Sequence, residues 1–71
     1  MIGRSVLLIE LEQHLGEAAK ALRCAWRLAK HNGMEPTAKE LADTVLDVET
    51  SYEMVRDERG AQLALDQRSK E

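Results

Sequence analysis

The sequence is poor in the residues that cross-link or anchor a small fold. It contains one cysteine, one proline, one tryptophan, one tyrosine and no phenylalanine in 71 residues. A single cysteine, Cys24, excludes an internal disulfide framework. The longest apolar run covers only residues 6–9, whereas a membrane span needs about 18 apolar residues and a signal-peptide core about seven. We therefore expect an intracellular, cytoplasmic protein without a membrane-spanning segment.

Apolar and charged side chains dominate what is present. The apolar residues make up 44% of the chain and the charged residues 32%, a balance typical of folded helical proteins rather than of disordered ones. The formal net charge of −3 argues against a nucleic-acid-binding protein. Because a domain this small buries only about 60% of the surface of its unfolded chain, we expect a partner subunit to add to its stability.

Apolar residues recur with helical spacing from about Ser5 to His31. Their steps alternate between three and four residues, at Leu8, Leu11, Leu15, Ala18, Leu22, Ala25 and Ala29. This spacing predicts one helix over about 5–31. Ser5 is the expected N-cap, and Asn32 followed by Gly33 is the expected stop.

A second segment with the same spacing begins at Thr37. Residues Thr37 to Glu40 match a capping box, in which each of these two side chains bonds the backbone amide of the other. The apolar positions of this segment are Ala38, Leu41, Val45, Val48, Tyr52 and Val55. We expect a helix over about 37–59, because Arg59 and Gly60 then interrupt the pattern. An extension to 66 stays open, and residues 67–71 are expected to be a flexible tail.

The short connection over residues 32–36 requires the two helices to be antiparallel neighbours. The predicted fold is therefore an all-α, antiparallel two-helix hairpin in a single domain. Apolar residues cover more than half of the circumference of the first helix, which is more than one neighbour can bury. We expect a homodimer of the four-helix-bundle type. The residues assigned to the core or the dimer interface are Leu8, Leu11, Leu15, Leu22, Leu28, Leu41, Val45, Val48, Tyr52 and Val55.

Charge is divided unevenly between the two segments. Residues 18–33 carry Lys20, Arg23, Arg27 and Lys30 and no acidic residue, whereas residues 34–53 are strongly acidic. The basic residues lie toward the C-terminal end of the first helix and the acidic residues toward the N-terminal end of the second, where the helix dipoles favour them. An antiparallel hairpin would place the two stretches side by side, so we expect the acidic helix to neutralise the basic one.

No motif for catalysis, a cofactor or a metal is recognisable. Cys24 and His31 share a helix face, but two ligands are too few for a structural zinc site. Paired carboxylates such as Glu53 and Asp57 would need a dry cleft for acid–base chemistry, and two helices do not offer one. We expect a protein without enzymatic activity, cofactor or metal.

The fragment from Gly33 to Asp43 includes the run Pro-Thr-Ala-Lys-Glu-Leu-Ala. It resembles the opening of the helix-turn-helix in sigma-factor-type and related bacterial DNA-binding proteins, and this resemblance implies a DNA-binding regulator with its motif at 37–59. Leu46 stands where that pattern has a glycine turn, and the recognition helix would carry acidic residues that repel phosphate. DNA binding is therefore the alternative function, and nucleic acid is not the expected partner.

The outer face of the second helix carries the predicted partner-binding residues. Leu46 and Met54 lie away from the apolar seam, with Thr50 between them and acidic residues around them. Apolar side chains ringed by charge of one sign suit a protein partner with a basic docking surface. The predicted set, with Trp26 added from the edge of the first seam, is Leu46, Thr50, Met54, Asp43, Asp47, Glu53 and Trp26.

These features predict a small regulator that occludes a larger protein, as an inhibitor, anti-activator or adaptor. The expected target is a transcription regulator, and a protein encoded by a phage or other mobile element would fit this size. A structural subunit of a helical assembly is the second alternative.

Overall fold

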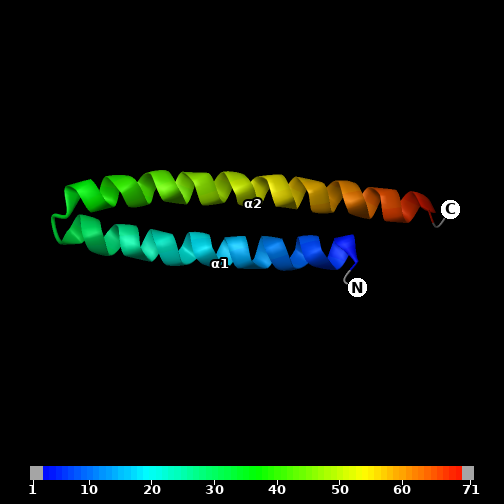
Figure 1. Ribbon diagram of the computed structural model, residues 1–71, viewed down its shortest axis with the longest axis horizontal. Helices are drawn as coiled ribbons and strands as arrows, with labels where there is room; N and C mark the ends of the chain where they lie inside the picture. Colours follow the sequence, from blue (N-terminus) through cyan, green and yellow to red (C-terminus); the bar gives the residue numbers. More distant parts are fainter. Residues whose placement is uncertain (1–2, 70–71) are drawn as a thin grey trace.

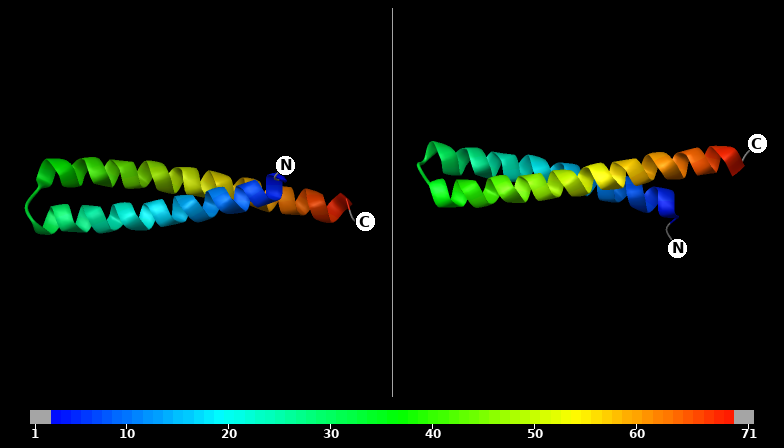
Figure 2. Two further views of the ribbon diagram at one scale, coloured as in Figure 1. Left: turned by 60° about the horizontal axis from the view of Figure 1, so that its bottom comes forward. Right: turned by 90° about the horizontal axis from the view of Figure 1, so that it is seen from above.

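The computed structural model describes residues 3–69, which form two long helices, α1 over Arg4–His31 and α2 over Glu35–Ser69. The helices run antiparallel and side by side, so that the molecule is a rod of 57 × 19 × 15 Å (Figure 1). The predicted all-α helical hairpin is confirmed. Because α2 has 35 residues and α1 has 28, the C-terminal end of α2 extends beyond the start of α1 (Figure 2). We call residues 4–12 of α1 and 58–69 of α2 the open end.

A Schellman turn ends α1 at His31 and reverses the chain. Gly33 has a φ of +69°, the left-handed conformation that glycine adopts without steric cost. The Met34 amide donates to the Ala29 carbonyl at 2.9 Å. The Gly33 amide donates to the Lys30 carbonyl at 3.3 Å. These two bonds satisfy carbonyl groups that the end of a helix leaves without an internal partner.

The start of α1 differs from the predicted one. The helix begins at Arg4, with Gly3 as its N-cap and no side-chain cap bond. Ser5 lies inside the first turn, and its hydroxyl donates to the Asp66 carboxylate of α2 at 3.0 Å. The prediction of Ser5 as a cap is therefore wrong, because its hydroxyl joins the two helices at the open end instead.

The start of α2 also differs. The helix begins at Glu35, ahead of Thr37, and the Met34 carbonyl accepts the Ala38 amide at 2.9 Å. The predicted capping box at Thr37 therefore does not form. Pro36 explains the earlier start, because a proline in the first turn lacks only an amide hydrogen that has no partner there.

α2 continues through Arg59 and Gly60 as one helix to Ser69, past the predicted end at 59. At Gly60 nothing lies within 4 Å of the place where a Cβ would stand. Its cost is therefore only the helix propensity of glycine, about 1 kcal/mol relative to alanine. Ion pairing of Arg59 with Glu12 holds this part of α2 against α1. Of the predicted tail, residues 67–69 are helical, and residues 70 and 71 lie outside the described range.

The two helices meet along a seven-residue repeat, and every position in it is buried or half-buried. On α1 the row consists of Ser5, Leu8, Glu12, Leu15, Ala19, Leu22, Trp26 and Ala29. On α2 it consists of Ala38, Leu41, Val45, Val48, Tyr52, Val55, Arg59, Gln62 and Asp66. This is the spacing of an antiparallel coiled coil. The most buried residues are Leu8, Ala19, Ala29, Ala38 and Val45, three of which are alanines, so the core is thin.

The row of α1 residues that packs on α2 agrees with the predicted row at every second position and lies one residue later at the positions between. The predicted row contained Leu11, Ala18 and Ala25 where the structure has Glu12, Ala19 and Trp26. Leu11 is 41% exposed, and Leu28, also assigned to the core or dimer interface, is 67% exposed. Polar pairing explains this register, because Glu12 in the interface can meet Arg59 of α2.

Candidate protein-binding surfaces

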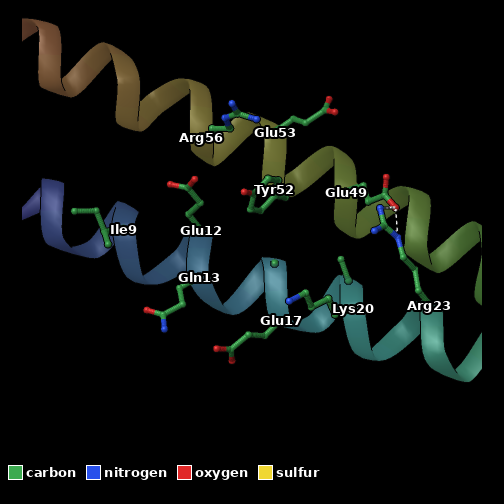
Figure 3. Close-up of a pocket in the computed structure, with 12 residues that line it drawn as sticks. Ile9, Glu12, Gln13, Glu17, Lys20, Arg23, Glu49, Tyr52, Glu53 and Arg56 are labelled. Atoms are coloured by element: carbon green, nitrogen blue, oxygen red, sulfur yellow. Dashed lines mark hydrogen bonds and ion pairs between the residues drawn. The ribbon is translucent and has the colours of Figure 1, made fainter.

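One side of the interface carries a row of side chains that are charged except for Gln13, and we call this row the charged flank. Its residues are Gln13, Glu17, Lys20, Arg23, Glu49, Glu53 and Arg56 (Figure 3). The Arg23 guanidinium binds the Glu49 carboxylate from its Nη2 at 2.6 Å and from its Nε at 3.1 Å. Both side chains are partly exposed, so this pair contributes less than about 1 kcal/mol to stability.

An open groove of about 700 Å³ runs along the charged flank past Gly16 and Tyr52. A Cβ at Gly16 would lie 3.4 Å from the Tyr52 ring, so the missing side chain leaves one edge of that ring uncovered. Figure 3 shows Tyr52 directed toward α1 from between Glu49 and Glu53. The groove is wide and open to solvent, and its walls are charged, so it suits contact with a protein surface more than a small molecule.

Trp26 lies half-buried in the interface, between two smaller hollows on the same side of the hairpin. The Lys30 ammonium stands 4.9 Å from the centre of its ring, within the range of a cation–π contact. Leu46 and Arg27 line the hollow on one side of Trp26, which holds about 350 Å³. Trp26 is therefore part of the interface and at the same time the floor of an accessible surface.

The predicted partner-binding residues of α2 form one exposed ridge, which we call the acidic ridge. It consists of Leu46, Thr50 and Met54 with Asp43, Asp47 and Glu53. Leu46 is 63% and Met54 65% exposed, and the Thr50 hydroxyl donates to the Leu46 carbonyl at 2.9 Å. Within residues 3–69, the carboxylates of this ridge form no ion pair. The ridge therefore keeps its negative charge unneutralised.

The predicted neutralisation of the basic stretch by α2 is found for one residue only. Arg23 pairs with Glu49, but Lys20, Arg27 and Lys30 form no ion pair with any residue in the described range 3–69. The reason is geometric. Arg23 lies beside the interface, whereas Lys20 and Arg27 lie farther around α1 and are exposed.

At the open end, polar groups lie between the helices and apolar groups lie outside. Asp66 accepts bonds from Ser5 at 3.0 Å and from Gln62 at 3.2 Å. Arg59 forms an ion pair with Glu12, and its Nη2 donates to Glu12 Oε1 at 3.3 Å. Its buried Nε meets the other carboxylate oxygen as an ion pair without a directed hydrogen bond. Exposed apolar side chains surround these contacts at Val6, Leu7, Ile9, Leu11, Leu63 and Leu65.

Sequence reasoning missed these interhelical pairs because it followed apolar residues alone. Glu12 and Arg59 occupy seven-residue-repeat positions on their helices, and opposite charges at such positions are the signal that could have located the pair.

The other residues considered for chemistry stand apart. Cys24 and His31 are both exposed on α1. In the part of the chain that the structure describes, no three His, Cys, Asp or Glu side chains are grouped so that they could hold a metal ion. Over the same residues, neither helix combines the length and the apolar character needed to cross a membrane.

The turn of a helix-turn-helix is absent at 37–59, because α2 runs without interruption through this stretch. The fragment that resembles such a motif is therefore the first part of one long helix. We found no protein-family model, no curated protein and no solved structure that matches this chain.

Proposed function

We propose that this protein is a small regulator that works as a homodimer and acts by covering a surface of a larger protein. The observation that carries the proposal is the acidic ridge. Two large apolar side chains, Leu46 and Met54, stand exposed among carboxylates that have no ion-pair partner within residues 3–69. Such a ridge suits a partner with apolar pockets in a basic surface, and the mechanism needs no chemistry from the regulator.

The surface area of the hairpin supports the homodimer. Its accessible surface is 5794 Å², whereas a compact monomer of this mass exposes about 4,500 Å². The excess of about 1,300 Å² exceeds the roughly 800 Å² that each partner buries in a standard interface. A second copy that covers part of this surface would compensate for the thin core.

The charge of the ridge indicates the class of target. Proteins that bind nucleic acid carry basic surfaces, and an acidic ridge is complementary to them. A transcription regulator is therefore the target that we propose, with the hairpin acting as its inhibitor, anti-activator or adaptor. Association through such charges is faster at low ionic strength.

Differential capture tests this proposal. Wild-type protein, the Leu46→Ser/Met54→Ser variant and the Lys20→Ser/Arg27→Ser control are each used as bait under the same conditions. We expect the same target with the wild type and the control, and at least a tenfold weaker capture with the ridge variant. Circular dichroism and sedimentation verify that the ridge variant keeps its helicity and mass.

Two outcomes would overturn the use of the ridge. If the Lys20/Arg27 control alone loses the target, the binding surface is the basic stretch and the partner is acidic. If all three baits capture the target equally, neither surface is involved.

A structural subunit of a helical assembly remains the second candidate, and the exposed apolar residues of the open end favour it. Copies that join through this end would form oligomers larger than two chains. Sedimentation separates the candidates, because the mass of a closed dimer does not rise beyond twice the chain mass at concentrations well above its dissociation constant.

A further inference from the structure

α1 carries a second row of residues with coiled-coil spacing beside the row that packs on α2. It consists of Leu7, Leu11, His14, Ala18, Ala21, Ala25 and Leu28. Ala18 and Ala25 of this second row are half-buried, and its other members are exposed. Each member precedes by one residue a member of the row that packs on α2, so the second row lies about 100° around the helix. The row contains no Lys, Arg, Asp or Glu. An unbroken seven-residue repeat of this kind is typical of a surface that packs on another helix.

The surface of α2 directly beside the interface on this side carries hydroxyl side chains. Thr37, Thr44 and Ser51 lie exposed beside the interface on the side opposite the charged flank. The Thr44 hydroxyl donates to the Glu40 carbonyl at 2.9 Å and so needs no outside partner. Farther around α2 on this side lie the exposed Glu40 and Asp47, and at the open end Arg4 and Glu58 pair at 3.0 Å. The two sides of the hairpin thus differ, because the charged flank has charged side chains on both helices, whereas the second row of α1 has no Lys, Arg, Asp or Glu.

We infer that a second copy of this chain covers the second row, with the two α1 helices antiparallel. This inference rests on the homodimer of the proposed function and names its surface. A basic or acidic protein is not the occupant that the row fits, because the row offers no charge of either sign. The excess surface of about 1,300 Å² per chain is enough for a dimer interface along one helix.

The order of side chains in the row favours the antiparallel arrangement. Pairing about Ala18 places Leu7 of one copy opposite Leu28 of the other. It also places Leu11 opposite Ala25, and His14 opposite Ala21. The layers of Leu11 and His14 then each combine a larger side chain with an alanine, so that the size of successive layers changes gradually along the pair. A parallel pair would bring two bulky layers and two His14 rings together at one end and leave alanine against alanine along the other half.

The angle between the two rows agrees with a four-helix bundle. Because α2 and the second copy would approach α1 from directions about 100° apart, α1 would occupy a corner with a neighbour on each side. Leu46 and Glu53 of the acidic ridge each follow a member of the α2 row by one residue, lie on the side of the charged flank, and would stay accessible in both copies. Dimerisation would therefore leave this part of the ridge to the target.

Cysteine cross-linking tests the face and the direction in one experiment. In a Cys24→Ser background, a short bismaleimide is applied to dilute protein carrying Ala18→Cys, Leu7→Cys, or Leu7→Cys with Leu28→Cys. We expect covalent dimers for Ala18→Cys and for the double variant, and none for Leu7→Cys alone. Positions 7 and 28 lie about 31 Å apart along one helix, so the reagent can join them only between chains. A Leu46→Cys variant on the acidic ridge is the control without a cross-link.

A charge substitution gives a second, independent readout. Ala21→Glu lies in the second row, and Ala64→Glu is its matched control, since both alanines are exposed in the hairpin. We expect Ala21→Glu to weaken dimerisation at least tenfold in sedimentation equilibrium and Ala64→Glu to leave it unchanged.

The outcomes separate the two levels of the proposal. A monomeric wild type at micromolar concentration would overturn the homodimer itself. A dimeric wild type that cross-links through Leu7→Cys alone would overturn the antiparallel arrangement. A dimer insensitive to Ala21→Glu, with no cross-link at Ala18→Cys, would place the interface on another face.

Discussion

Replacing Gly16 by alanine tests how closely the two helices approach each other. Gly16 lies in the middle of α1, where glycine is less favourable than alanine by about 1 kcal/mol. A Cβ added there would stand 3.4 Å from the Tyr52 ring, close to an ordinary van der Waals distance. The added methyl group would therefore pack against the ring without displacing it. We expect Gly16→Ala to raise the free energy of unfolding by about 1 kcal/mol.

Gly60→Ala is the matched control for this substitution. Gly60 lies inside α2 with nothing within 4 Å of its missing Cβ, so that only helix propensity changes there. Its expected gain is also about 1 kcal/mol. Any difference between the two variants reports the contact with Tyr52. Because a stabilisation of about 1 kcal/mol raises the Tm of a domain this small by roughly 4–8 °C, thermal unfolding followed by circular dichroism resolves both effects.

Protein concentration must be equal in all samples, since the unfolding of a dimer depends on it. A destabilised Gly16→Ala beside a stabilised Gly60→Ala would show that α1 and α2 approach more closely than in this structure. A Gly60→Ala variant with unchanged Tm would show that α2 does not form a stable helix past residue 59.

Two further predictions concern polar groups in the hairpin. Glu12→Leu should lower the free energy of unfolding by about 1–2 kcal/mol in urea denaturation, because it removes the partner of an Arg59 side chain that is only 33% exposed. Adding Arg59→Leu should restore that loss, and a double variant no more stable than Glu12→Leu would refute this account. Thr37→Ala should change the Tm by less than about 2 °C, because Thr37 is not the cap of α2. A fall of about 5 °C would instead show that Thr37 caps the helix, as the sequence predicts.

The hairpin itself could be predicted from the sequence, because its two causes are local. Long apolar periodicity on both sides of one short breaker segment requires two antiparallel helices. The row on α2 is also readable, because α2 has a single row of apolar residues from Ala38 to Val55, and this row faces α1. The helix starts were misplaced because a side-chain cap was expected at Ser5 and Thr37, whereas Gly3 and Met34 precede the helices.

The register of α1 could not be obtained from apolar spacing alone. Its two rows differ by one residue and have the same period, so both satisfy a search for helical amphipathicity. The acidic ridge was accessible to sequence reasoning because it follows from the face opposite the row of α2. The groove beside Gly16 and the hollows beside Trp26 were not, because they depend on which residues of the other helix stand across the interface.

Polar residues decide which row of α1 meets α2, and this choice has a consequence for the rest of the surface. If α1 rotated by one residue to bury Leu11, Arg59 would face a leucine and Glu12 would turn toward solvent, which leaves a partly buried guanidinium without its partner. The hydrogen bond from the Ser5 hydroxyl to the Asp66 carboxylate would be lost as well. The polar pairs at the open end thus disfavour the alternative register. They also leave the second row of α1 outside the hairpin, where Leu7, Leu11 and Leu28 are available to a second copy. α1 thus carries two rows one residue apart, and only one of them contains acidic and hydroxyl groups. This difference accounts both for the register of the hairpin and for the surface that we assign to its dimer.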